Sequence, residues 1–508
     1  MAFRYVLVSA CAAIVALASV AAAIGDRGPV REFGRVAKPD RPPEWAQYML
    51  ARRVVPGTTE IALDAYTRAQ QAAKALPRHS AVTGKSYDAD AAKAAPRWEF
   101  LGPTNVAGRA RTLEFDPRNP NRMLIGGVSG GVWESLDAGE SWQPLSEGAE
   151  FINIGALAID PVEPDTIYAG TGELYRNSGQ PYAAMWGQGI LVSRDGGRTF
   201  VQLSATASDE FRYVADVVVS PHDHRRLYAA TSSGIWRSND AGVSFQQVLR
   251  PIDASGRLRY EGCNDLQLLP DPSRDRLVAA CASRSIDDRY WLPGTILPVN
   301  DCGTDRPCPA TVFLNEDAGS GGAFQPVLSE PGMGRTIFDY ARSSPNIVYA
   351  LSASILPGTD RNGDGAGDYD NGLHALFRSE DGGRTWQPRL RHDSPDTLST
   401  YLLSYSDNFE QCRGYFDAYS AGWYNMALAV DPRNADVVWT GGMELFRSDD
   451  GGRSFGKGSI YTANTQGGFG VHADMHLIRF HPGYDGIANQ KLYVNNCLLY
   501  TSPSPRDS

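Results

Sequence analysis

The pentapeptide His472-Ala-Asp-Met-His476 carries side chains well suited to chemistry. If this segment is a strand, the alternation of side chains puts His472, Asp474 and His476 on one side. Arg109 and Arg111 are likewise two residues apart near the start of the repeats. Together these side chains could bind a metal ion or a ligand, or supply an acid and a base. The alternative is that they only line a polar, water-filled channel, as Asp216, Asp339 and Asn425 on comparable strands would.

A second candidate site consists of two carboxyl groups, Glu173 in the stretch GTGELYRNS and Asp417. Glycoside hydrolases use such a pair as acid and base or as acid and nucleophile. We keep Glu173 and Asp417 as candidate catalytic residues.

A third candidate is the loop DRNGDGAGDYD, which runs from Asp360 to Asp370. It matches the first half of a calcium-binding loop, with Asp360, Asn362, Asp364 and Asp368 as oxygen ligands. The twelfth position is Asn371 rather than glutamate, and no helical pattern flanks the loop, so it is not an EF-hand. The expectation is one calcium ion, and the alternative is a solvated Gly/Asp-rich loop.

These candidates are set among copies of one octapeptide, Ser-x-Asp-x-Gly-x-Ser/Thr-aromatic. The stretches SLDAGESW, SRDGGRTF, SNDAGVSF, SEDGGRTW and SDDGGRSF follow it, and NEDAGSGGAF is a degenerate copy. Short β-branched and aromatic runs bounded by Gly, Pro and Asn surround each copy, which is typical of strands. We expect each octapeptide to be a hairpin turn whose aspartate accepts backbone hydrogen bonds; these structural aspartates are Asp137, Asp195, Asp240, Asp317, Asp381 and Asp450.

The octapeptide resembles the Asp-box (BNR) repeat of sialidases, VPS10/sortilin-like domains and related secreted propellers. The stretch WEFLGPTNVAGR, from Trp98 to Arg109, looks like the entry to bacterial secreted VPS10/sortilin-like propellers. The resemblance implies an all-β β-propeller of about seven four-stranded blades, the last one truncated. It occurs in both enzymes and binding proteins, so it does not decide the function.

Two departures weaken the enzymatic interpretation. No Phe/Tyr-Arg-Ile-Pro motif is present, so the arginines of sialidases cannot be carried over. Xyloglucanase-like propellers resemble the first blade but have a catalytic aspartate before the GG of that strand, where this chain has Ser129.

Propeller geometry indicates which face holds a site. The octapeptides and the short proline turns lie on one face, and the long connections lie on the other. Aromatic side chains in those connections suit sugar or peptide recognition. We expect ligand contacts from Trp186, Trp291 and Trp423, with Arg109, Arg111, His472, Asp474 and His476 at the channel mouth.

The termini differ in composition from the repeats. Arg4 followed by an apolar run and Ala21-Ala22-Ala23 predicts a signal peptide over 1–23, and hence a secreted or periplasmic protein with no membrane span after cleavage. Residues 24–97 are expected to form an arm with one or two helices, and 98–496 the propeller. Residues 497–508 resemble a translated sequencing adaptor and are expected to be a non-native tail.

The net charge and the positions of the cysteines give expectations about the kind of partner and about disulfide bonds. A net charge of −10 argues against a nucleic-acid partner. Disulfides are expected for Cys263–Cys281, which flank a turn symmetrically, and for Cys302–Cys308 in a short loop.

The favoured function is binding of a glycan or an extracellular protein on the long-loop face. Glycoside hydrolysis and a structural or assembly role are the alternatives.

Overall fold

The computed structural model describes residues 68, 72, 78–79, 86–87, 108–145, 153–173, 187–252, 262–282, 309–356, 372–392, 402–404, 420–459 and 471–497. The chain divides into two units, Met1–Trp45 and Ala46–Ser508, and all residues that the structure describes belong to the second. No helix among them is long and apolar enough to cross a membrane.

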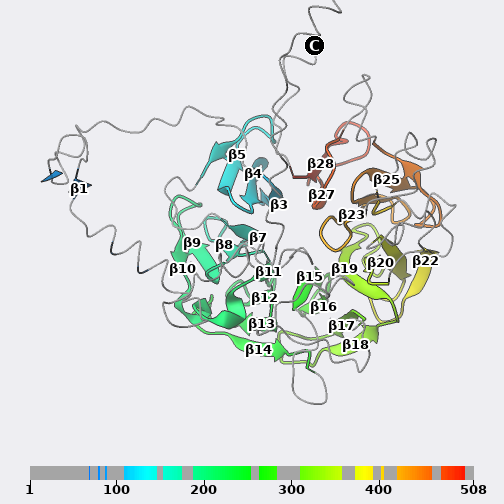
Figure 1. The fold of residues 1–508 in the computed structure, drawn as a ribbon, viewed down its shortest axis with the longest axis horizontal. Coiled ribbons are helices and arrows are strands. Elements are labelled where there is room, and N and C mark those ends of the chain that lie inside the picture. Colours follow the sequence, from blue (N-terminus) through cyan, green and yellow to red (C-terminus); the bar gives the residue numbers. More distant parts are fainter. Residues whose placement is uncertain are drawn as a thin grey trace, which may run out of the picture. The chain divides into compact units, whose positions relative to one another are not determined.

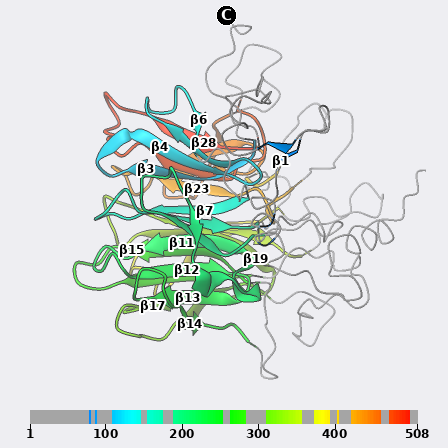
Figure 2. The ribbon, with the colours of Figure 1, turned by 90° about the vertical axis from the view of Figure 1, so that its left-hand side faces the viewer.

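Six four-stranded antiparallel sheets and one two-stranded sheet are arranged in a ring (Figure 1). Their innermost strands line a central cavity, the channel. Each four-stranded sheet is a blade whose strands follow one another outward, as the third blade shows from the side (Figure 2). The first blade consists of β3 (Ala110–Asp116), β4 (Asn119–Gly127), β5 (Gly131–Ser135) and β6 (Gln143–Pro144), and the second of β7 (Ile154–Ile159), β8 (Ile167–Thr171), β9 (Ile190–Ser193) and β10 (Val201–Gln202). The third blade consists of β11 (Val214–Val219), β12 (Leu227–Thr231), β13 (Gly234–Ser238) and β14 (Gln246–Leu249), and the fourth of β15 (Cys263–Leu269), β16 (Arg276–Cys281), β17 (Thr311–Asn315) and β18 (Gln325–Leu328). The fifth blade consists of β19 (Met333–Tyr340), β20 (Val348–Ser354), β21 (Leu373–Ser379) and β22 (Gln387–Arg391), and the sixth of β23 (Ala427–Val430), β24 (Val438–Gly441), β25 (Leu445–Ser448) and β26 (Gly456–Lys457).

The prediction of about seven four-stranded blades is wrong in number. The seventh place in the ring holds only the two-stranded sheet of β27 (Leu477–Phe480) and β28 (Leu492–Asn495). This sheet still closes the ring, because Leu477 and Tyr493 pack on the core of the first blade and the backbone N–H of Ala110 donates to Asn496 O over 3.3 Å. The architecture is therefore a β-propeller of six complete blades.

The predicted helical arm is not supported either. Of residues 24–97, the described part holds a two-stranded sheet, β1 (Arg78–His79) with β2 (Ser86–Tyr87), and two isolated residues, Arg68 and Ala72, with helical backbone. In the propeller, the only helices among the described residues are the short 3₁₀ turns Ser204–Thr206 and Asp209–Phe211.

The core lies between blades, where second and third strands of neighbouring sheets interdigitate. The fourth and fifth blades show this arrangement: Val312 and Leu314 of β17 pack with Phe377 of β21 and with Trp386. The second strands β8, β12 and β16 are buried along their whole length. Small residues such as Gly170, where an added Cβ would come within 2.6 Å of Val214, allow adjacent blades to approach.

The repeated octapeptides form the turns between third and fourth strands, and we call them box turns. In Ser379–Trp386, the hydroxyl of Ser379 donates to Asp381 Oδ1 over 2.8 Å, and the backbone N–H of Thr385 donates to the same oxygen over 2.9 Å. The same two bonds recur around Asp137, Asp195, Asp240 and Asp450. Asp317 lies in a looser version, in which Ser320 N donates over 3.3 Å.

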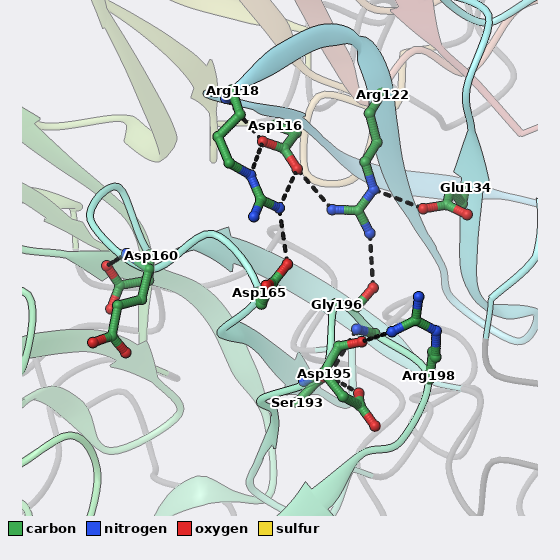
Figure 3. Close-up of polar contacts among 12 residues, drawn as sticks. Asp116, Arg118, Arg122, Glu134, Asp160, Asp165, Ser193, Asp195, Gly196 and Arg198 are labelled. Carbon is green, nitrogen blue, oxygen red and sulfur yellow. Dashed lines mark hydrogen bonds and ion pairs between the residues drawn. The ribbon is translucent and has the colours of Figure 1, made fainter.

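Box turns also join neighbouring blades. Arg122 of the first blade donates to the carbonyl oxygen of Gly196, in the box turn of the second, over 2.7 Å (Figure 3). Equivalent carbonyls accept bonds from the preceding blade in three further turns: Ala318 O from Arg237, Gly382 O from Arg276 and Ala138 O from Tyr493. These four box turns therefore fix one blade against the next as well as reversing their own strands.

A disulfide joins Cys263 and Cys281, which lie opposite each other in the β15–β16 pair, where the sequence analysis expects it. Cys302 and Cys308 lie outside the described residues.

Candidate functional site at the mouth of the channel

A β-bulge interrupts the beginning of five of the seven innermost strands. The register shifts at Ala110/Thr112, Ile154/Ala156, Val214/Asp216, Cys263/Asp265 and Met333/Thr336. Bulges commonly re-aim a side chain at the end of a sheet. The bulged residues all line the central cavity: Arg111, Gly155, Ala215, Asn264 and Arg335. Two of these five equivalent positions thus place an arginine in the channel.

Glu173 is the centre of the polar cluster at this end of the channel. It follows β8 in the connection between the second and third strands of its blade, and its side chain is only 3% exposed. Arg109 Nη2 donates to Glu173 Oε2 over 2.8 Å, and Arg111 donates to Oε1 through Nε and Nη2 over 3.2 and 3.1 Å. A buried carboxylate needs such partners because desolvation of an unpaired charge is costly.

Tyr424 completes the coordination of Glu173 from the opposite side of the ring. Its hydroxyl donates to Glu173 Oε1 over 2.6 Å. The guanidinium carbons of Arg109 and Arg111 lie 5.3 and 4.3 Å from its ring centre, within the range of cation–π attraction. Burial, together with the nearby charge of Glu173, raises the pKa of the Tyr424 phenol well above its ordinary value, so the hydroxyl keeps its proton and donates.

The backbone carbonyl of Tyr424 is a common acceptor for Arg111 and Arg335, the two arginines at bulge positions. Its carbonyl oxygen accepts a bond from Arg111 Nη1 over 3.2 Å and one from Arg335 Nη1 over 2.5 Å. Tyr424 therefore contacts Arg109, Arg111, Arg335 and Glu173, which come from three blades. Tyr424 was not among the predicted site residues, because its only signal in the sequence was an aromatic residue next to Trp423 in a long connection.

His476 packs against Tyr424, with the two rings nearly perpendicular and their centres 5.0 Å apart. Burial and the positive charges of Arg111, Arg109 and Arg335 lower the pKa of His476 well below its ordinary value, so the imidazole is neutral. Arg111 Nη1 lies 3.1 Å from His476 Nδ1. Because a guanidinium can only donate, Nδ1 is the acceptor and the proton of the neutral ring is on Nε2.

Asp474 and His472 lie in the connection that leads to β27, as His476 does, but their backbone does not have the predicted strand geometry. Asp474 has φ of 65°, a left-handed conformation that is rare outside glycine, and β27 begins only at Leu477. The expected strand alternation is therefore wrong here. Asp474 accepts a bond from Asn425 Nδ2 over 2.5 Å, whereas His472 contacts Cys497 Sγ at 3.2 Å. Only His476 of the three reaches the arginines in the contacts described above.

The central cavity that Arg111, Arg335 and His476 line has a volume of about 150 Å³ and is also lined by carboxyl groups of the inner strands. Burial raises the pKa of Asp216 well above its ordinary value and that of Asp265 to about 7. Asp265 Oδ2 accepts the backbone N–H of Phe338, and Asp339 Oδ2 accepts that of Val430, each over 2.8 Å. These aspartates therefore bond the inner strand of one blade to that of the next.

The remaining predicted residues divide between the described and undescribed parts of the chain. Trp423 is half-buried, with its ring 5.1 Å from that of Tyr424. Outside the described residues lie Trp186, Trp291, Asp417 and the predicted calcium ligands Asp360, Asn362, Asp364 and Asp368. Within the described ranges, no group of three or more His, Cys, Asp or Glu side chains is arranged to hold a metal ion.

Comparison with curated proteins links this propeller to xyloglucanases. A xyloglucanase from Hypocrea jecorina is 26% identical over 313 residues, which are 58% of this chain and 34% of that protein. One from Paenibacillus sp. is 34% identical over 134 residues, which are 23% of this chain and 12% of that protein. The chain therefore spans about a third or less of the length of these relatives.

Solved structures with a similar fold include a GH74 enzyme from Niastella koreensis, with a TM-score of 0.47 and 17% identity over 75% of this chain and 50% of that one. No family model matches the chain. The chain is thus a β-propeller with xyloglucanase-like relatives, and the resemblance to Asp-box and VPS10 repeats stays a prediction.

Proposed function

We propose that this chain is a glycoside hydrolase propeller that binds a xyloglucan-like polysaccharide at the channel mouth. The observation that carries the proposal is the cluster of Glu173, Tyr424 and two arginines in a chain whose curated relatives are xyloglucanases. The same similarity favours a glycan over the extracellular protein that the sequence analysis kept as another ligand.

The chemistry of the mouth suits a neutral sugar chain. Arg109 is the more accessible of the two arginines, with 31% of its side chain exposed against 5% for Arg111. Its guanidinium can donate to sugar hydroxyls, and the half-buried Trp423 and Tyr424 offer ring faces to the apolar face of a sugar. Glu173 holds Arg109 and Tyr424 in place before the ligand arrives.

Hydrolysis needs two carboxyl groups with different roles. Both oxygens of Glu173 already accept hydrogen bonds, from Arg109 on one side and from Arg111 and Tyr424 on the other. Glu173 therefore fits a carboxylate that stabilises charge or orients water better than it fits the proton donor. Asp417 remains the candidate for the donor.

The test is a pair of assays on purified protein with tamarind xyloglucan and its oligosaccharides. We expect release of reducing ends by the unchanged chain and a loss of at least about 100-fold in Glu173→Gln, in the range for removal of one transition-state contact. Arg109→Ala should weaken calorimetric binding at least tenfold. The matched control is Arg198→Ala, which removes an exposed arginine from a box turn at the other end of the strands. An unchanged chain that neither binds nor cleaves the glycan, or a fully active Glu173→Gln, contradicts the proposal.

A further inference from the structure

Asp474 has a backbone conformation that costs energy. Its φ of 65° lies in the left-handed region, which residues other than glycine rarely adopt. In the described part of the chain, the other non-glycine residues with positive φ are Ala138 and Ala241, which hold the same position in two box turns. Asp474 belongs to no such repeated turn. Backbone strain of this kind is concentrated at functional sites, where the surrounding structure maintains it.

The neighbours of Asp474 hold it in this conformation. Ala473 and Met475 are 3% and 0% exposed, and Met475 belongs to the apolar core of the sixth blade. The backbone N–H of Met475 donates to Gly442 O over 2.8 Å. From Ala473 to His476, Asp474 is the one residue that is only half-buried. The packing therefore fixes the backbone on both sides of Asp474 and leaves its carboxyl group outside the core.

A hydrogen bond places this carboxyl group beside the cluster at the mouth. Asn425, which is 2% exposed, donates from Nδ2 to Asp474 Oδ1 over 2.5 Å. The residue before Asn425 is Tyr424, whose hydroxyl donates to Glu173. Asp474 and Glu173 thus accept hydrogen bonds from two consecutive residues of the connection that leads into β23. Both carboxyl groups belong to the same end of the channel.

The two carboxyl groups have different surroundings. Glu173 is 3% exposed and forms ion pairs with Arg109 and Arg111. Among the residues that the structure describes, no arginine, lysine or histidine forms an ion pair with Asp474, and the group that orients its Oδ1 is a neutral amide. A proton added to Glu173 would break its ion pairs, whereas Asp474 can take up a proton without that loss. Asp474 is therefore better suited to accept a proton during a reaction.

We propose that Asp474 is the general base of the hydrolysis proposed above, so the inference rests on the proposed function. The oxygen of a water molecule bonds to the anomeric carbon of the sugar, and the glycosidic C–O bond breaks. An acid gives its proton to the leaving oxygen, while Asp474 takes the proton that the water loses. Exchange with solvent then restores both groups. Glu173 holds Arg109 and Tyr424 against the sugar during this step.

The test is Asp474→Asn, assayed on tamarind xyloglucan. Asparagine tolerates the left-handed backbone and keeps an acceptor for Asn425, so the variant loses only the proton acceptor. We expect kcat to fall at least about 100-fold, in the range for general base catalysis, with KM and the melting temperature nearly unchanged. The fall of kcat/KM toward acid pH in the unchanged chain should be absent from the residual activity of the variant. The matched control is Asp485→Asn, in the exposed turn between β27 and β28, which should keep its kcat.

The outcomes separate this assignment from the function on which it rests. Hydrolysis that survives Asp474→Asn with a kcat near that of the unchanged chain overturns the assignment alone. So does a loss of activity that is confined to KM, or one that leaves the acid side of the pH profile in place. An unchanged chain that does not hydrolyse the polysaccharide overturns the proposed function and the assignment with it. If Asp474→Asn does not fold, Asp474→Gly carries the same test, because glycine adopts the left-handed backbone without strain.

Discussion

The hydroxyl of Tyr424 donates to Oε1 of Glu173 over 2.6 Å, joining residues 251 positions apart in the sequence. Glu173 comes from the second blade and Tyr424 from the connection that leads into the sixth, so the bond spans the channel mouth. It fixes the ring of Tyr424 beside Arg109 and Arg111, and it supplies a donor to a carboxylate that has little access to water. This contact makes the mouth a preorganised site rather than a collection of polar side chains.

Tyr424→Phe removes that donor and keeps the ring. We expect a loss of about 1–3 kcal/mol in the free energy of unfolding, the cost of leaving a buried acceptor short of a partner. Glycan affinity should fall as well, because Glu173 and the arginines lose a common contact. Urea denaturation and calorimetry measure the two effects. Tyr484→Phe is the matched control: its hydroxyl donates to Asp431 Oδ2 over 2.7 Å away from the mouth, so it should cost stability but not affinity.

Asp381→Ala should lower the free energy of unfolding and leave glycan affinity unchanged. Although burial opposes the shift, hydrogen bonds from Thr385 and Ser379 lower the pKa of Asp381 to about 2, so it accepts these bonds as a carboxylate at neutral pH. Their loss should cost about 1–3 kcal/mol and leave glycan binding intact. Glu380→Ala, at the adjacent exposed position, should change stability by less than about 1 kcal/mol, as is usual for surface ion pairs. Loss of binding in a folded Asp381→Ala protein would mean that the box turns take part in function.

Arg122→Met tests the bond between neighbouring blades. Arg122 bonds Asp116 Oδ2, Glu134 Oε1 and Gly196 O, and the side chain of Asp116 is only 2% exposed (Figure 3). Asp116 keeps Arg118 as a partner, so we expect a loss of about 3 kcal/mol, the lower end for breaking a buried ion pair. Thermal and urea unfolding measure it. Arg198→Met, whose bond to Asp195 O is exposed, should be nearly neutral, and equal losses in both variants would contradict a special role for Arg122.

The channel carboxyl groups predict a dependence of stability on pH. Burial raises the pKa of Asp265 to about 7 in the folded chain, against about 3.9 in an unfolded one. The contribution of this group to stability is therefore complete below about pH 4 and is lost as the pH rises toward 7. The neighbouring Asp216, Asp339, Arg335 and Arg479 share the cavity and modulate the effect.

Asp265→Asn keeps an acceptor for Phe338 N but cannot ionise, so it should gain stability relative to the unchanged chain between pH 4.5 and pH 7.5. Unfolding free energies at the two pH values measure this. A constant difference between the two proteins across that range would show that Asp265 titrates normally.

The sequence predicted the architecture because strand and turn signals repeat locally. The octapeptide fixes a hairpin through its own aspartate, as the bonds of Asp381 illustrate, so no long-range information is needed. The expectation of about seven blades counted the last one as truncated, and the described strands at that place form only a two-stranded sheet, so the complete blades number six. The predicted helices of residues 24–97 rested on spacing alone, and the described part of that segment holds only two isolated helical residues and a short two-stranded sheet.

The site was only partly predictable for a related reason. Spacing singled out Arg109, Arg111 and His476, but the cause of their convergence is the bulge at Arg111 and not a shared strand face. The left-handed backbone of Asp474 broke the alternation on which His472 was assigned. Tyr424 escaped notice because its partners are distant in sequence, and only the closed ring brings them together.

The position of a bound xyloglucan oligosaccharide in a crystal of this protein tests the account most directly. We predict density at the channel mouth, with a sugar hydroxyl within hydrogen-bonding distance of Arg109 and a ring face against Trp423 or Tyr424. Density over the box turns at the other end of the strands, with the mouth empty at saturating ligand, would contradict it.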